Sequence, residues 1–345
     1  MRLKFCAAVI TLLLCGVCLS RSASAAVVKV MPAWLGTPHD MVFHIATRGE
    51  QVWAVGSFGI LVHRTPQSPW KLISDTGGAA MLGIAFAPSG DGVAVGQAGA
   101  LYEVAANYDS WTQHDVGTKE RLFAVAASSK GEFVAVGSFG TILDRPAGSK
   151  DWHQVNATFS GGTTPHLYDV RFDDDTAYVV GEDETVITVK GGVATEVRDL
   201  GAPERPKLAP GATPMQEAAA AAGISGAAPV EPAFFAAVNC RGAVIASGQQ
   251  GLLAIKRPGS DWQIQTVPGK PDFFGLACTP DGQLVGTSAG FLMVGKPQGT
   301  GWTWEALPVV PVRLDWIASA ITLDKDGILL AGPAAVWEGQ LDGSR

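Results

Sequence analysis

The chain has 345 residues, of which 47% are hydrophobic and only 17% are charged, with 42 glycines and 21 prolines. Few charges and many glycines suit an all-β domain with many turns. The formal net charge of −7 argues against nucleic acid or anionic lipid as a partner, because both bind a basic protein face.

The first 25 residues have the pattern of a secretory signal peptide. Arg2 and Lys4 precede an apolar stretch at 5–19, and Ala23-Ser24-Ala25 matches a cleavage site. Cleavage there would leave a mature chain of 26–345 in the periplasm or outside the cell. A retained membrane anchor is the alternative. The short apolar stretch disfavours it, and we expect no membrane insertion after cleavage.

One short pattern recurs along the rest of the chain. It consists of an apolar β-rich run, a tight turn with glycine and a second apolar run, which together predict a hairpin. The copies begin at Val52, Val93, Phe133, Ala177, Val244, Leu284 and Ile328. Because they return at a steady period, they indicate a repeat architecture.

Tryptophan marks a second feature of the same repeat. Trp70, Trp111 and Trp152 are spaced by 41 residues, and Trp262 and Trp302 are spaced by 40. Each tryptophan begins a short strand, so one repeat contains four strands, as a blade of a β-propeller does. The sequence therefore predicts an all-β fold with about seven blades, and we expect the tryptophans to pack between blades.

Two segments depart from the period. The stretch at 201–231 is rich in Ala, Pro and Gly, so we expect a flexible insertion that is either a plain linker or a lid or docking loop. A strand predicted at 27–31 precedes the first repeat, whereas the last repeat, at 316–340, lacks its fourth strand. We therefore expect the N-terminal strand to complete the last blade and close the ring.

Two cysteines, Cys240 and Cys278, remain after the predicted signal peptide. They occupy nearly matching places in neighbouring repeats and would lie in an oxidising compartment. The sequence leaves open whether they form a disulfide.

The V-A-V-G-x-x-G hairpin and the tryptophan strand resemble those of the photosystem II stability/assembly factor-like propellers, within the wider group that has BNR (Asp-box) repeats. The resemblance covers the mature chain apart from 201–231. It implies an exported seven-bladed propeller without catalysis, acting as a scaffold or assembly factor for a membrane complex. The Asp-box turn survives only in fragments, at 109–111, 148–152 and 259–262, and nothing in the sequence points to a photosystem.

The candidate motifs for catalysis and metal binding lack the structural surroundings or the partner residues that these functions require. The stretch at 286–290 matches G-x-S-x-G, but a strand follows it instead of the helix that a serine-hydrolase elbow requires. A sialidase-like hydrolase would need an arginine cluster and a Tyr-Glu pair, and neither pattern is recognisable. The histidines are scattered, and the acidic run at 173–175 lies in a predicted turn. We expect no enzyme, no metal and no cofactor.

Function is expected where the repeats differ from one another. Most repeats have small or apolar residues at the start of the innermost strand, but a few have polar residues there, and the last repeat adds two charges. The candidates are His44, Arg121, His166, Asp169, Asp272, Arg313 and Asp315. We expect them to converge on one mouth of the central channel, where propellers usually bind. Ordinary solvated loops are the alternative.

These observations favour a monomeric, exported propeller that binds a protein partner, which we expect to be a membrane-embedded envelope complex such as a transporter. A glycan- or small-ligand-binding propeller is the alternative, with a sialidase-like hydrolase as a distant third. A further possibility is that the insertion at 201–231 carries the docking function.

Overall fold

The computed structural model describes residues 27–57, 59–65, 68–106, 110–160, 164–197, 200, 232–310, 316–323 and 326–341. The predicted signal peptide at 1–25 and the predicted insertion at 201–231 lie outside these residues. The described elements are β-strands and three short 3-10 turns. No helix in this part of the chain has the length and hydropathy that a membrane span requires.

Five sheets have four antiparallel strands each, hydrogen-bonded in the order of the chain. Their strands are β2 (Val42–Arg48), β3 (Gln51–Gly56), β4 (Ile60–Thr65) and β5 (Ser68–Asp75); β6 (Met81–Phe86), β7 (Gly92–Gly96), β8 (Leu101–Val104) and β9 (Thr112–Gln113); β10 (Leu122–Ala127), β11 (Phe133–Gly137), β12 (Ile142–Arg145) and β13 (His153–Gln154); β14 (Leu167–Asp173), β15 (Thr176–Gly181), β16 (Val186–Lys190) and β17 (Val193–Glu196); β18 (Phe234–Cys240), β19 (Ala243–Gly248), β20 (Leu252–Lys256) and β21 (Gln263–Thr266).

The sixth sheet has eight strands and contains the N-terminal strand. Its order is β22 (Gly275–Cys278), β23 (Leu284–Thr287), β24 (Phe291–Gln298), β25 (Gly301–Val310), β1 (Val28–Leu35), β28 (Ala335–Gln340), β27 (Gly327–Gly332) and β26 (Ser319–Thr322). The antiparallel pairing of β1 with β28 confirms that the N-terminal strand completes the last repeat. A short parallel pairing of β1 with β25, with Val28 opposite Val309, was not predicted.

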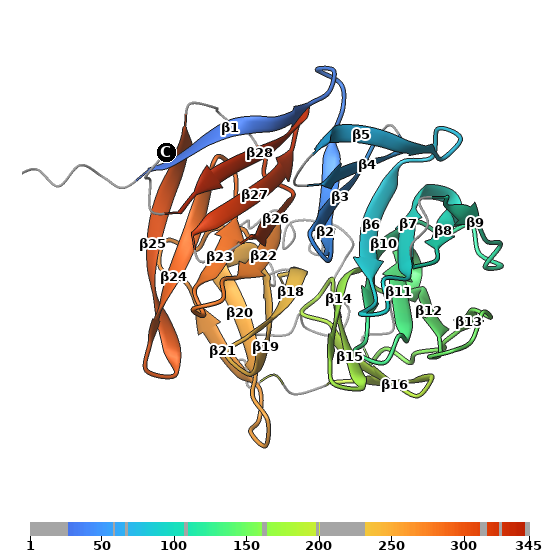
Figure 1. The fold of residues 1–345 in the computed structure, drawn as a ribbon. Coiled ribbons are helices and arrows are strands. Elements are labelled where there is room, and N and C mark those ends of the chain that lie inside the picture. The colour runs from blue at the N-terminus through green and yellow to red at the C-terminus, as the bar shows by residue number, and fades with distance from the viewer. Residues whose placement is uncertain are drawn as a thin grey trace, which may run out of the picture.

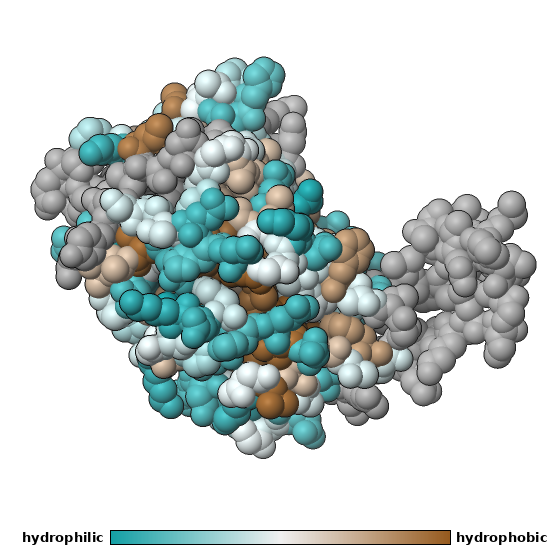
Figure 2. Space-filling model, turned by 90° about the vertical axis from the view of Figure 1, so that its right-hand side faces the viewer, coloured by the Kyte–Doolittle hydropathy of each residue, from teal (hydrophilic) through white to brown (hydrophobic). Residues whose placement is uncertain are grey.

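The innermost strands form a closed ring. In the order β2, β6, β10, β14, β18, β22 and β26, each contacts the next, and β26 contacts β2. Figure 1 shows the sheets around this ring, with the N-terminal strand β1 beside the last strands of the chain. The arrangement confirms the predicted β-propeller fold. Figure 2 views the side on which β9 and β13 lie, where hydrophilic residues cover most of the face.

Burial on both sides explains the composition of the second strand of each sheet. Every residue of β7, β11, β19 and β27 is buried, because neighbouring sheets cover both faces. The tryptophans pack across these interfaces, as predicted. Trp111 lies against Trp53 of the preceding sheet, with ring centroids 5.7 Å apart, and Trp262 lies 6.0 Å from Tyr178.

The disulfide that the sequence left open is present in the structure. Cys240 at the end of β18 is bonded to Cys278 at the end of β22, with Cα atoms 5.6 Å apart. The bond joins two neighbouring innermost strands at their C-terminal ends. It therefore adds a covalent connection between two sheets that packing and hydrogen bonds also hold together.

We expect the Cys240→Ala/Cys278→Ala double variant to lower the free energy of unfolding by about 2–4 kcal/mol, because the bond closes a loop of 38 residues in the unfolded chain. Urea denaturation of the wild type with its disulfide intact and of the double variant would measure the difference in the free energy of unfolding. Equal midpoints with equal slopes would contradict a stabilising role.

Candidate functional site

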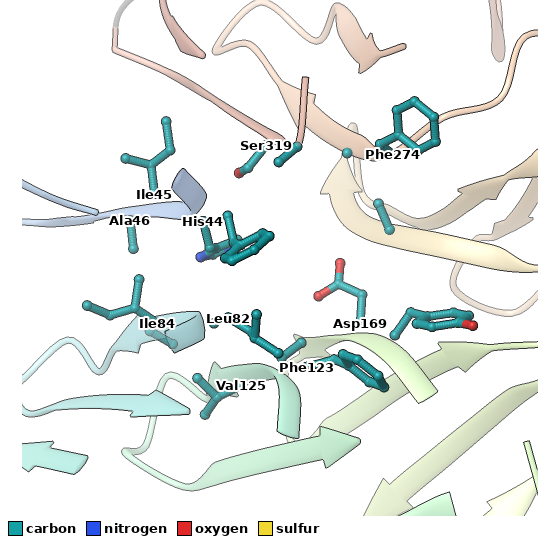
Figure 3. Close-up of a pocket in the computed structure, with 18 of the residues that line it drawn as sticks. His44, Ile45, Ala46, Leu82, Ile84, Phe123, Val125, Asp169, Phe274 and Ser319 are labelled. Carbon is teal, nitrogen blue, oxygen red and sulfur yellow. The ribbon is translucent and has the colours of Figure 1, made fainter. Parts of the chain in front are cut away.

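The ring of innermost strands encloses a cavity of about 840 Å³. All seven innermost strands contribute residues to its wall. Figure 3 shows side chains from several of these strands pointing towards the cavity, among them His44, Phe123 and Asp169. A cavity of this size is typical of small-molecule sites, and it is the main candidate for function in the fold.

An aromatic girdle surrounds this channel. Its members are half-buried residues at or near the start of the innermost strands: four at the second position, Phe274 directly before β22, and Trp316 three residues before β26. They are Phe43, Phe123, Tyr168, Phe235, Phe274 and Trp316, and neighbouring ring centroids lie 5.2–6.3 Å apart. Leu82 of β6, which also lines the cavity, occupies the equivalent position between Phe43 and Phe123.

A local irregularity of the strands accounts for four aromatic members of the girdle and for Leu82. In β2, β6, β10, β14 and β18 the register with the next strand shifts at the second residue, for example between Leu122 and Ala124. Such a bulge leaves the extra residue unpaired and changes the direction of its side chain. The aromatic residue therefore turns towards the channel, while the residues on either side keep their places in the sheet.

A tight turn at the channel mouth carries the most exposed aromatic residue in the described part of the chain. In the turn η2 (Ser138–Gly140), Phe139 has a left-handed φ of 51° and is 62% exposed. The preceding Gly137 is required because a Cβ atom there would collide with the carbonyl oxygen of Arg121. The same carbonyl accepts a 2.8 Å hydrogen bond from the Ser138 amide, which fixes the turn beside the start of β10.

Two of the predicted site residues hold such turns in place instead of lining the cavity. The Phe139 amide donates to Nδ1 of His166 at 3.1 Å. At the equivalent turn η3 (Gln249–Gly251), the Gln250 amide donates to Oδ1 of Asp272 at 2.8 Å. Each acceptor belongs to the sheet that follows its turn, so the polarity of His166 and Asp272 has a structural explanation.

His166, which contacts Phe139, connects to further polar groups of the neighbouring sheet, and Arg121 directly precedes β10. The exposed guanidinium of Arg121 lies 5.9 Å from the centre of the Phe123 ring. The Tyr168 hydroxyl donates to Oε1 of Glu182 at 3.0 Å, and burial together with this carboxylate raises the pKa of Tyr168 to about 12. The other carboxylate oxygen of Glu182 accepts from the His166 amide at 2.8 Å.

Two residues of β14 place opposite charges inside the channel. Oδ2 of Asp169 accepts a 2.7 Å hydrogen bond from the Ala237 amide, and Nε of Arg171 donates to the Ala237 carbonyl at 3.3 Å. Burial raises the pKa of Asp169, against the opposing effects of Arg171 and of the amides of Ala237 and Val170. Both residues thus join β14 to the neighbouring strand β18.

His44 lies in the channel wall as a neutral side chain. Burial, with a smaller contribution from the charge of Arg171, lowers its pKa to about 4. A hydrogen bond to the backbone of Ile84 opposes this shift, and Nδ1 of His44 is buried without a hydrogen-bond partner.

The structure thus divides the predicted site residues. His44, Arg121 and Asp169 line the cavity, whereas His166 and Asp272 support turns. Arg313 and Asp315 lie outside the described residues.

Sequence reasoning missed the aromatic girdle, Arg171 and Phe139. The girdle has a sequence signal, because an aromatic residue directly follows a buried residue at or just before the start of the strand at Phe43, Phe123, Tyr168, Phe235 and Phe274. Within the described ranges, no group of three His, Cys, Asp or Glu residues could hold a metal ion.

No family model and no curated protein matches the sequence. Solved structures do match the fold. The chain is similar to YCF48 bound to a D1 peptide, with a TM-score of 0.63, 14% identity, and coverage of 91% of this chain and 96% of the other. For YCF48 from Cyanidioschyzon merolae the TM-score is 0.65 at 14% identity, with coverage of 92% and 98%.

An enzyme shares the same architecture. A streptogramin B lyase matches with a TM-score of 0.69 and 10% identity over 90% of this chain and 97% of the other. Identities this low establish the fold alone, so the comparisons show that the chain is a β-propeller built like YCF48.

The neutral His44 predicts a pH dependence of stability. Since the pKa of His44 is about 4 in the folded protein and near 6.5 in an unfolded chain, the unfolded state takes up a proton first as the pH falls. The stabilisation is therefore complete above pH 6.5 and is lost between about pH 6.5 and 4. We expect the melting temperature of the wild type to fall more steeply across this window than that of His44→Leu. Parallel curves would contradict the assignment.

Proposed function

We propose that the protein is an exported, non-enzymatic scaffold that binds a protein partner at the channel mouth around Phe139. This surface, here called the mouth patch, comprises Arg121, Phe123, Phe139, His166, Tyr168 and Glu182. The proposal rests on one observation, the exposure of a bulky aromatic side chain at a left-handed position.

The turn itself does not need an aromatic residue at this position. Ala98 in the turn η1 (Gln97–Gly99) and Gln250 in η3 adopt nearly the same conformation, with φ of 55° and 57°. A left-handed conformation is unfavourable for a bulky residue, and an exposed phenylalanine gains nothing from burial. Residues in unfavourable backbone conformations cluster at functional sites. We therefore attribute the exposed Phe139 to contact with a partner.

The surroundings of Phe139 suit a protein interface. Its ring lies 4.8 Å from the His166 ring, so a partner would meet a supported aromatic surface. Arg121, which lies over the Phe123 ring, and Glu182, which accepts from the His166 amide, add both signs of charge to the mouth patch. Aromatic residues and arginine contribute strongly to binding energy in protein interfaces. A partner segment with an apolar anchor and flanking charges would match this surface.

Export is supported by two observations. The first 25 residues have the pattern of a secretory signal, and the Cys240–Cys278 disulfide is of the kind that persists in oxidising compartments. We propose a periplasmic location, with a membrane-embedded envelope complex such as a transporter as the partner. The similarity to YCF48 bound to a D1 peptide supports the binding of a polypeptide.

A role in binding instead of catalysis is supported by the chemistry of the channel. Both carboxylate oxygens of Asp169 already accept hydrogen bonds from backbone amides, and His44 donates to a backbone group. Both side chains thus have structural roles, which explain their polarity without a catalytic one. The lyase neighbour shows that the fold is compatible with catalysis, so the proposal depends on these side chains and not on the fold.

We expect Phe139→Ala to reduce recovery of the partner from detergent-solubilised membranes by about tenfold or more, as is typical of a hot-spot aromatic residue. The matched control is Val193→Ala, because Val193 on β17 is 64% exposed but lies outside the mouth patch. Quantitative pull-down with the tagged, disulfide-bonded protein would measure both. Equal recovery with the two variants would refute the role of Phe139, and failure of the wild type to recover a defined partner would refute the scaffold itself.

A further inference from the structure

The interior of the channel has properties that the mouth patch does not use. Its volume of about 840 Å³ could hold a small organic molecule, and its wall consists mainly of aliphatic and aromatic side chains. Figure 3 shows the Asp169 carboxylate pointing into this space, beside Phe123 and across from His44. A cavity lined by apolar groups with a few polar ones is the usual form of a ligand site.

Asp169 and Arg171 retain unused binding capacity in the channel. Arg171 uses Nε for the Ala237 carbonyl, and its two terminal nitrogens have no hydrogen bond or ion pair to any residue in the described part of the chain. Each carboxylate oxygen of Asp169 accepts one amide hydrogen bond and can accept another. No ion pair within 4.0 Å joins the two side chains, although both flank Ala237.

Their position is fixed by the fold. Because both side chains are hydrogen-bonded to the backbone of one residue of the neighbouring strand, neither can turn away without breaking a contact between β14 and β18. The anion and the cation are thus held side by side on one wall. Preorganised polar groups of this kind bind a matching ligand with little loss of conformational entropy.

The charged side chains of the channel wall indicate which class of ligand would fit. His44 is neutral, and Arg121 lies at the exposed mouth, so the interior combines one cation with one anion. A simple anion would meet Asp169 unfavourably, and a simple cation would meet Arg171. A molecule with adjacent positive and negative groups satisfies both, and the aromatic girdle offers an apolar surface to the rest of that molecule.

We propose that the channel binds a free α-amino acid with an apolar or aromatic side chain. Its carboxylate pairs with the terminal nitrogens of Arg171, and its ammonium group donates to Asp169. The side chain packs against the aromatic girdle, with Phe123 and Phe274 among its contacts. The site lies inside the channel and does not depend on the partner proposed for the mouth patch.

Isothermal titration calorimetry of the mature protein with L-tryptophan, L-phenylalanine and L-leucine tests the proposal. We expect at least one of them to bind, and we expect at least tenfold weaker binding when its ammonium is acetylated or its carboxylate is removed, as in N-acetyl-L-tryptophan and tryptamine. Absence of binding by all three amino acids would overturn the proposal. Equal affinity for the N-acetylated or decarboxylated compound would also overturn it, because the paired charges would then not be recognised.

Two variants separate the channel from the mouth. Arg171→Met should weaken binding of the amino acid at least tenfold, whereas Phe139→Ala, at a residue that does not line the cavity, should leave it within threefold of the wild type. A failed partner assay therefore does not affect this test. If Arg171→Met does not fold, as judged by its melting curve, the acetylated and decarboxylated compounds still decide the outcome. Binding of a peptide by its C-terminus, with no binding of free amino acids, would replace the proposal.

Discussion

The structure depends on the burial of both faces of its inner strands. Neighbouring sheets cover the second strand of each repeat so completely that β7, β11 and β19 have no exposed residue. An inner strand with regular alternation directs its side chains mainly towards these two interfaces. The bulge at the second residue of β2, β6, β10, β14 and β18 turns an additional side chain towards the centre, beside other wall residues such as Asp169 and Arg171.

Backbone hydrogen bonds between sheets explain much of the polarity near the mouth. The amides of Phe139 and Gln250 point out of their own turns, and His166 and Asp272 of the following sheets accept from them. Asp169 and Arg171 perform a similar task for Ala237 farther inside. Because each of these side chains hydrogen-bonds a backbone group of a neighbouring sheet, its polarity has a structural explanation first. Only groups with capacity left over, such as the terminal nitrogens of Arg171, are available to a ligand.

The channel and its mouth therefore offer two different kinds of surface. The mouth patch is exposed and centred on one phenylalanine held at a left-handed φ, which suits a polypeptide partner. The interior is enclosed, largely apolar and carries one fixed pair of opposite charges, which suits a small molecule. Both derive from the same hairpin repeat. The turn between the second and third strands shapes the mouth, and the first strand lines the interior.

The sequence by itself determined the β-propeller fold and the completion of the last repeat by the N-terminal strand, because period, turn glycines and tryptophan spacing are local patterns. It also singled out His44, Arg121 and Asp169, which line the channel in the structure. These polar residues stand at positions where most other repeats have small or apolar residues. Tertiary structure decided the rest. The roles of His166 and Asp272, the Cys240–Cys278 bond and the pairing of β1 with β25 depend on which sheets become neighbours. Most of the aromatic girdle depends on bulges that shift the register by one residue, and a pattern of residue types does not show where a strand will bulge.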